Sequence, residues 1–307
     1  MLYFPYFGRR RLRAPCWIVA VLLAALMFVA SGVEIAAAAT PRANMSWHEI
    51  DTAHFQIFKW QASNAHSDDS DLKSTCEEAI TRQSTYWFGR VEPLDRKCVI
   101  ILYPNNESYF RAVGGNATQT AGTVLTGFDG QLAFSRIELP ENRSDWETAC
   151  LPHELTHVLL AQRFARRKLP AWINEGTALL ADPASKQSLH LRDCHRALRN
   201  GTAFALADLM SLTDYPDRRS WPAFYGQSLS LAKCLVERQS PRAFVDFIDK
   251  SLKYNYTTAL REVYDIQDIV HLQQIWSQYV SQCDVQLDRS TRAPKHRLLG
   301  STRSIAQ

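Results

Sequence analysis

The sequence predicts an α+β fold, with a mixed β-sheet lobe in the first part of the chain and a mainly helical lobe after it. Between residues 47 and 139, short apolar runs bounded by turn residues alternate with helical stretches. From residue 144 to residue 283, apolar residues recur at helical spacing. The roughly 250 residues between the two chain ends suit one large domain or two fused lobes.

Three strand regions are expected in the sheet lobe. Trp47–Trp60 is expected to be one strand, bent or bulged, and Lys97–Tyr103 a buried strand that ends at a turn sequence. Gly122–Leu139 contains a Gly-Phe-Asp-Gly turn between two strand-like runs. The pattern predicts helices over Asp71–Phe88 and Glu107–Val113, before and after the buried strand.

A capping box, Ser144 to Glu147, marks the expected start of the helical region. Pro152 interrupts it, because proline removes a helical hydrogen bond and clashes with the preceding turn. Either the helix kinks just before residue 153, or a new helix begins with Pro152 as its first residue. The later helices are expected over Ala171–Ala181, Lys186–Arg199, Phe224–Arg238, Pro241–Leu252 and Ile269–Cys283.

The N-terminus has the pattern of a secretory signal peptide over residues 1–39. Four arginines between Arg9 and Arg13 precede an apolar run, Trp17–Ala30, and Ala37–Ala39 offers a cleavage site before Thr40. The apolar run is shorter than the approximately 20 residues of a membrane-spanning helix. The mature protein is therefore expected to be secreted or to reside in the cell envelope or periplasm, and an uncleaved anchor in the membrane is the alternative.

The C-terminus, residues 286–307, is expected to be a basic disordered tail after a folded region over residues 40–285, divided near residues 165 and 166. Residues 1–39 hold four arginines and one glutamate, so their removal lowers the formal charge from +4 to +1. Much of the remaining positive charge lies in the last twenty residues. The folded region is then slightly acidic, which gives no indication of nucleic-acid binding. Oligomeric state is not indicated.

Six cysteines remain after the expected signal peptide, an even number in an exported chain: Cys76, Cys98, Cys150, Cys194, Cys234 and Cys283. Up to three disulfides are possible, and buried thiols are an equal alternative. Six Asn-X-Ser/Thr sequences, at Asn44, Asn106, Asn116, Asn142, Asn200 and Asn255, fit the surface loops of a secreted protein.

The most informative motif is His-Glu-Leu-Thr-His at residues 153–157. On a helix, His153 and His157 lie on the same face, so both imidazoles can bind one zinc ion. Glu154 between them can reach the water in an open coordination position. Eighteen positions after His157, Glu175 supplies a third ligand on the next expected helix. Two histidines, one glutamate and an open position form a catalytic zinc shell.

Three segments carry a resemblance to known proteins: HELTHVLL (His153–Leu160), LPAWINEGTA (Leu169–Ala178) and FYGQSLSLAKCLVE (Phe224–Glu237). Together with the order of sheet and helices, they resemble the gluzincin metallopeptidases, and among these the peptidase MA-like group of exported, mostly bacterial proteins. The resemblance implies a zincin-like fold, zinc ligands at His153, His157 and Glu175, and Glu154 as general base. No segment like the GAMEN motif of zinc aminopeptidases precedes His153, which favours an endopeptidase over an aminopeptidase.

The resemblance also implies a second donor to the developing oxyanion, for which Tyr225 is the candidate. Asn174 and Asp182 could orient ligands, although helix capping or solvation is the simpler interpretation of both. Residues 132–137 are expected to form an edge strand along which a protein or peptide substrate pairs. The predicted function is zinc-dependent peptide hydrolysis, and the alternative is a catalytically silent zincin-fold binding or scaffold protein of the cell envelope.

Overall fold

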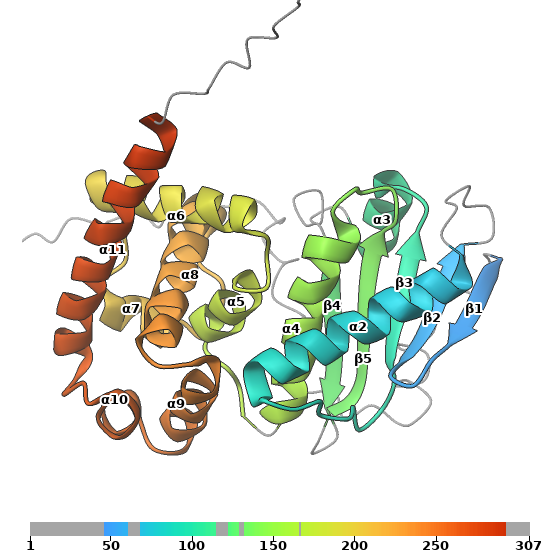
Figure 1. Ribbon diagram of the computed structural model, residues 1–307, viewed down its shortest axis with the longest axis horizontal. Coiled ribbons are helices and arrows are strands. Elements are labelled where there is room, and N and C mark those ends of the chain that lie inside the picture. Colours follow the sequence, from blue (N-terminus) through green and yellow to red (C-terminus); the bar gives the residue numbers. More distant parts are fainter. Residues whose placement is uncertain (1–45, 61–67, 115–121, 129–131, 166, 293–307) are drawn as a thin grey trace, which may run out of the picture.

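The first half of the chain forms one five-stranded mixed sheet, seen on the right of Figure 1. The computed structural model describes residues 46–60, 68–114, 122–128, 132–165 and 167–292. Its strands are β1 (Trp47–Asp51), β2 (Phe55–Trp60), β3 (Cys98–Tyr103), β4 (Thr123–Phe128) and β5 (Leu132–Pro140). Their order is β1-β2-β3-β5-β4, in which β2, β3 and β5 are parallel and the two outer pairs are antiparallel. The predicted α+β class is confirmed.

The segment from Trp47 to Trp60 is a hairpin, whereas the sequence was expected to give one bent strand. Thr52 makes the turn: its N–H donates to the Phe55 carbonyl over 2.9 Å, and its hydroxyl oxygen accepts from the Phe55 N–H over 3.0 Å. These two bonds close the chain on itself and reverse its direction within three residues. The sequence did not indicate this turn, because residues 52–54 contain neither glycine nor proline.

The expected edge strand over residues 132–137 is wrong. This segment belongs to β5, which lies between β3 and β4 and is paired on both sides. The outer strand is β4, whose residues are mostly half-buried. The free edge nearest the histidine motif is therefore that of β4.

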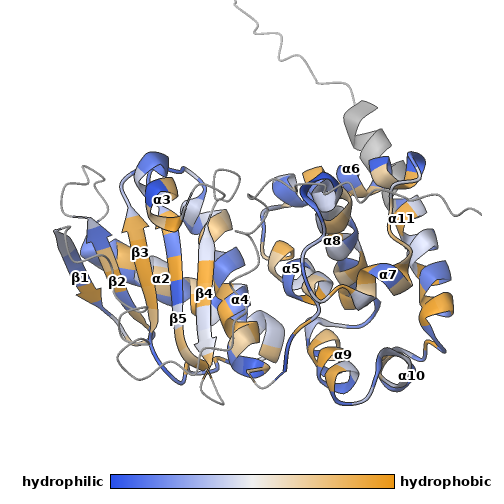
Figure 2. Cartoon of the chain, turned by 180° about the vertical axis from the view of Figure 1, so that it is seen from behind, coloured by the Kyte–Doolittle hydropathy of each residue, from blue (hydrophilic) through white to orange (hydrophobic). Residues whose placement is uncertain are grey.

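Helices cover both faces of the sheet. On one face lie α2 (Asp69–Phe88) and α4 (Leu151–Arg163), whose apolar side chains pack with those of β2, β3 and β5. On the other face lies α3 (Asn106–Val113), which buries Tyr109 against Val99 and Ile101. Because both of its faces are covered, β3 is buried and hydrophobic along its length (Figure 2).

The second half of the chain is helical. It contains α5 (Ala171–Leu179), α6 (Ala184–Arg199), α7 (Leu206–Ser211), the 3₁₀ turn η3 (Arg218–Ser220), α8 (Trp221–Arg238), α9 (Pro241–Lys253), α10 (Tyr256–Tyr264) and α11 (Ile269–Arg292). The short helices α7 and α10 were not expected from the sequence. Residues 286–292 continue α11, so this part of the expected disordered tail is helical; the rest of the tail lies outside the described residues, as does the expected signal peptide.

The helical half has a hydrophobic core around α8, to which α2 contributes Trp87 and the end of α4 contributes Leu160 and Phe164. A second core lies between the sheet and its helices. Two glycines allow close contact between helices: Gly176 between α5 and α8, and Gly226 between α8 and α6. A Cβ atom at Gly176 of α5 would overlap the Ser228 carbonyl, and one at Gly226 of α8 would lie 2.7 Å from the Cys194 nitrogen of α6. The position of α5, which carries Glu175, is thus fixed by close backbone packing on α8.

Among the five cysteines whose side chains the structure describes, the disulfides that the sequence allowed are not formed. Cys76, Cys98 and Cys150 are buried thiols, and Cys194 and Cys234 are buried as well. Burial raises the pKa of Cys98 to about 12 and that of Cys150 to about 11. Thiols with such a pKa carry little thiolate near neutral pH and behave as apolar core residues.

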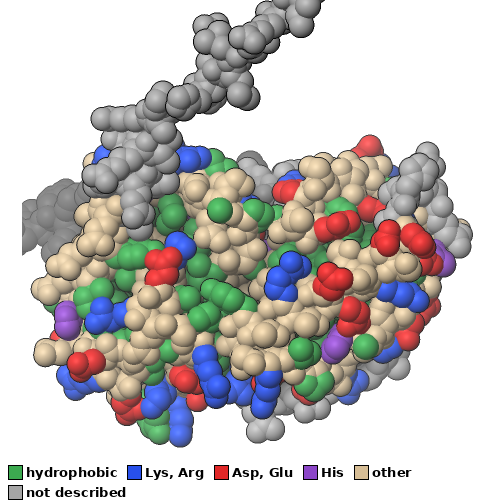
Figure 3. Space-filling view, in the orientation of Figure 1, with side chains coloured by type: hydrophobic (Ala, Val, Ile, Leu, Met, Phe, Trp, Pro, Cys, Tyr) green, Lys and Arg blue, Asp and Glu red, His purple; other side chains and the backbone are tan. Residues whose placement is uncertain are grey.

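The described surface carries acidic and basic side chains in mixed order over α2 and its surroundings (Figure 3). Within the described residues, no helix is both long enough and apolar enough to cross a membrane.

Candidate metal centre

The helix that carries the histidine motif begins with a widened turn. Residues Trp146–Cys150 are π-helical, and the Leu151 N–H bonds to the Trp146 carbonyl five residues back before α4 continues in α-helical geometry. Pro152 lies in the first turn of α4, where its missing N–H has little effect. The predicted capping box is not formed, because Asp145 precedes the first helical residue and its carboxylate is paired with Arg143 at 2.8 Å.

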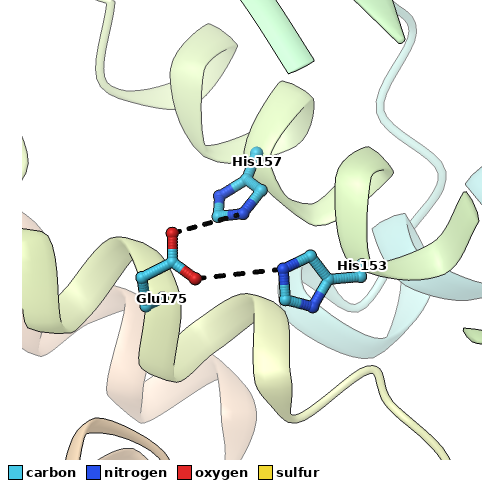
Figure 4. A group of neighbouring side chains, drawn as sticks. All are labelled: His153, His157 and Glu175. Atoms are coloured by element: carbon cyan, nitrogen blue, oxygen red, sulfur yellow. Dashed lines mark ion pairs between the residues drawn. The ribbon is translucent and has the colours of Figure 1, made fainter. Parts of the chain in front are cut away.

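His153, His157 and Glu175 come together between α4 and α5 (Figure 4). Glu175 Oε2 lies 3.9 Å from His153 Nε2, and its Oε1 lies 3.8 Å from His157 Nε2. The imidazole rings are 5.0 Å apart between centroids, and His157 and Glu175 are buried. Among the described residues, this is the one group of three or more metal-binding side chains whose ligand atoms all lie within 4.8 Å of one another.

The second nitrogen of each imidazole faces a polar partner. His157 Nδ1 lies 3.1 Å from Asn174 Oδ1, and His153 Nδ1 lies 3.3 Å from Asp182 Oδ1. Asn174 and Asp182 thus contact the histidine rings, which is the interpretation that the sequence favoured less. Lys186 in turn lies 3.1 Å from both oxygens of Asp182.

The contacts with His153 and Lys186 lower the pKa of the Asp182 carboxyl. Burial alone would raise the pKa of its carboxyl, but the proximity of His153 and Lys186 outweighs burial and lowers that pKa. A carboxylate thus lies behind His153, in the place where metal-ligating histidines commonly have a hydrogen-bond acceptor.

The residues fit a zinc ion. Two imidazole nitrogens and one carboxylate are a catalytic zinc donor set. Two ligands bonded to one zinc at about 2.0–2.1 Å in tetrahedral geometry lie about 3.3 Å apart. The nitrogen-to-oxygen distances of 3.8 and 3.9 Å require only a small inward movement of these side chains. Both Nε2 atoms face Glu175, while both Nδ1 atoms face partners outside the cluster.

Glu154 lies beside this cluster, on the helix turn between the two histidines. It is 7% exposed, and the backbone of Gly122 packs directly on it: a Cβ at Gly122 would lie 2.8 Å from Glu154 Oε1. Burial raises the pKa of the Glu154 carboxyl, while His153 and His157 oppose that rise. Gly122 precedes β4, so the free edge of the sheet starts next to Glu154. Sequence reasoning did not identify Gly122 as a site residue.

Tyr225, the candidate oxyanion donor, lies in α8 and is half-buried. Its ring packs 6.0 Å from that of His190 and 6.2 Å from that of Trp221. Burial and the charges of Glu175 and Glu154 raise the pKa of Tyr225, so its phenol stays protonated and lies within electrostatic range of both carboxyls.

Tyr215 is a site residue that sequence reasoning missed. It lies between α7 and η3, and its hydroxyl donates a hydrogen bond to Glu175 Oε1. The residue as a whole is 50% exposed, although the hydroxyl end points inward to Glu175. Burial of that end, together with the charge of Glu175, raises the pKa of Tyr215. No sequence signal links the two residues, since forty positions separate them and Tyr215 belongs to no helix or strand.

Comparison with known proteins adds a distant structural similarity. No protein-family model matches the chain, and no curated protein sequence does so either. Among solved structures, the chain is similar to a variant of an M1 zinc metallopeptidase from Deinococcus radiodurans bound to a Tyr-Ser-Ala substrate, with a TM-score of 0.40 and 17% sequence identity. The similarity covers 76% of this chain and 50% of that enzyme, so the chain spans about half the length of the structure it matches.

Proposed function

We propose that the protein is a zinc-dependent peptidase with a zincin-like fold that hydrolyses internal bonds of peptides or unfolded proteins. The observation that carries this proposal is the cluster of His153, His157 and Glu175, with Glu154 buried beside it on the same helix turn. A bound zinc would polarise the substrate carbonyl and lower the pKa of a water molecule.

The chain's own residues would perform the remaining steps. Glu154 would take a proton from the attacking water and pass it to the leaving amine. Its burial supports this role, because a carboxyl whose pKa is raised above its usual value takes up and releases a proton more readily near neutral pH. The protonated phenol of Tyr225 would donate a hydrogen bond to the developing oxyanion.

The substrate would pair with β4 instead of the strand expected from the sequence. The edge of β4 is open in the described sheet, and the strand starts at Gly122, which contacts Glu154. Backbone hydrogen bonds along an edge strand hold an added peptide in extended form. A peptide paired with β4 would pass the proposed general base, because Gly122 at the start of this strand contacts Glu154. The absence of a side chain at Gly122 leaves room for Glu154 at that point.

Zinc analysis combined with a cleavage assay tests this function. The purified protein is expected to hold about one zinc per chain and to cleave an unfolded protein. It should also cleave a peptide whose N-terminus is blocked, because the sequence has no GAMEN-like segment before His153 to bind a free amine. A chelator should abolish cleavage and added zinc should restore it. If the zinc-loaded protein cleaves no unfolded protein and no member of a peptide library, the proposal gives way to a binding or scaffold protein with an intact metal site.

Export is a second part of the proposal, supported by the basic and apolar segments before Ala37–Ala39. A mature chain that begins near Thr40 is expected in the native host, in the cell envelope or outside the cell. N-terminal sequencing of the native protein measures this directly. A chain that still starts at Met1 and is extracted only with detergent would establish the membrane-anchored alternative.

A further inference from the structure

We infer that Tyr215 is a positioning residue that fixes Glu175 as the third metal ligand; this inference rests on the proposed function. The Tyr215 hydroxyl donates to Glu175 Oε1, the oxygen that lies 3.8 Å from His157 Nε2. The other oxygen, Oε2, lies 3.9 Å from His153 Nε2. A glutamate side chain can turn about its terminal bond, and a donor on one oxygen holds the carboxylate plane so that each oxygen faces one histidine.

Three contacts attach the segment that carries Tyr215 to the start of α5. The Ala171 N–H donates to the Leu212 carbonyl over 3.0 Å, and Lys168 Nζ lies 2.9 Å from Asp214 Oδ1. The hydrogen bond from Tyr215 to Glu175 is the third. Residues 168–175 and 212–215 are therefore neighbours at successive points, and the phenol reaches Glu175 from a segment that is itself bonded to the same helix.

The ring of Tyr215 also packs against an aromatic residue of α8. It packs edge-on against Phe224, with centroids 5.8 Å apart and an interplanar angle of 69°, and Phe224 is fully buried in α8. The next residue, Pro216, accepts a hydrogen bond from Trp221 Nε1 over 3.1 Å. Phenylalanine at position 215 would keep the ring packing and remove only the hydroxyl. The hydrogen bond to Glu175 can thus be tested without removing the ring.

Tyr225 is the matched control. It lies one residue after Phe224 and makes ring contacts with His190 and Trp221, but in the described part of the chain it donates no hydrogen bond to Glu175. The loss of its hydroxyl removes a phenol from the same site without removing the donor on Glu175. The two tyrosines therefore separate a role in holding the ligand from a role toward the substrate.

The experiment measures the zinc dissociation constant of the wild type, Tyr215→Phe and Tyr225→Phe by competition with a chromogenic chelator. Loss of a hydrogen-bond partner of a metal ligand typically weakens metal binding about 10–100-fold. That loss is expected for Tyr215→Phe, with Tyr225→Phe close to the wild type. The visible absorption spectrum of the cobalt-loaded protein should also change in Tyr215→Phe, because it reports the geometry of the ligands and not the stability of the fold.

Three results would contradict the positioning role of Tyr215. A zinc-binding wild type with an unchanged dissociation constant and an unchanged cobalt spectrum in Tyr215→Phe would overturn the positioning role and leave the proposed function standing. Equal weakening in both tyrosine variants would also overturn it, since the effect would not be specific to the Glu175 donor. A wild type that binds no zinc would overturn the proposed function and this inference together.

Discussion

Replacing Glu154 with glutamine is expected to lower the rate of peptide hydrolysis at least about a hundredfold while zinc content stays at the wild-type level. Glutamine keeps the size of the side chain but cannot accept a proton near neutral pH. Positioned general bases typically contribute about 10²–10⁴-fold to a rate. Because Glu154 lies beside the cluster and is not one of its three ligand residues, its charge is not required to hold the metal.

Steady-state kinetics on an unfolded protein substrate, with metal analysis of the same preparations, measures both quantities. Glu154 is buried against the backbone of Gly122, so the thermal midpoint of each variant should be compared to confirm that the replacement packs normally. A Glu154→Gln variant that holds zinc, folds and keeps more than a tenth of the wild-type activity would contradict the assignment of Glu154 as general base.

Replacing His157 with alanine is expected to abolish stoichiometric zinc binding. The change removes one of three ligands and also leaves Asn174 without the ring that its side-chain oxygen contacts at 3.1 Å. With one histidine and one glutamate left, the site loses the donor set that a catalytic zinc requires. Metal analysis after dialysis against a weak chelator is the measurement.

His54 provides the matched control for this variant. It is also a partly buried histidine beside a carboxylate, with its Nδ1 2.6 Å from Glu77 Oε2. It lies between β1 and β2, at the opposite end of the strand order from β4, and is not part of the cluster. His54→Ala should keep one zinc per chain. Zinc retained at full stoichiometry in His157→Ala, or lost equally in both variants, would rule out the proposed ligand set.

The parts that the sequence predicted well depend on neighbours along the chain. The spacing of His153 and His157 places two rings on one helix face whatever the rest of the fold does, and Glu175 comes from the next helix in sequence. The individual helices also follow from local signals. The α2 helix, for example, ends at Gly89, whose φ of 73° is the left-handed conformation that glycine adopts most easily.

The place of a strand within the sheet could not be predicted in the same way, because it depends on partners distant in sequence. In β5, Arg136 and Glu138 have the polar alternation of a strand with one exposed face. In the fold, Glu138 is 3% exposed, paired with Arg136 at 2.7 Å and bonded by the Tyr103 hydroxyl at 3.0 Å. This polar face is buried because α3 covers it and because Glu138 is paired with Arg136. Only the assembled sheet reveals that β4 is the edge.

The site was predicted incompletely for the same reason. His153, His157 and Glu175 come from two consecutive helices, whereas Tyr215 reaches Glu175 from a segment after α7. Likewise, Gly122 meets Glu154 only because β4 pairs with β5, and an isolated glycine before an apolar run has many simpler interpretations. Asp182 contacts His153 because α5 ends beside α4, which the sequence does not specify.

The hydrophobic cores of the sheet half and the helical half meet along α4, the helix that carries both histidines. From Leu151 to Leu159, the apolar side chains of α4 belong to the core shared with the sheet. Leu160 and Phe164, at the end of the same helix, pack in the helical core with Trp172 and Ile173, the residues beside Glu175. A metal ion bound by His153, His157 and Glu175 would add a link between α4 and α5 to this apolar contact. A ligand present at about a hundred times its dissociation constant stabilises the native state by about 2.7 kcal/mol. Metal loading at such a concentration is therefore expected to raise the free energy of unfolding of the whole chain by about that amount.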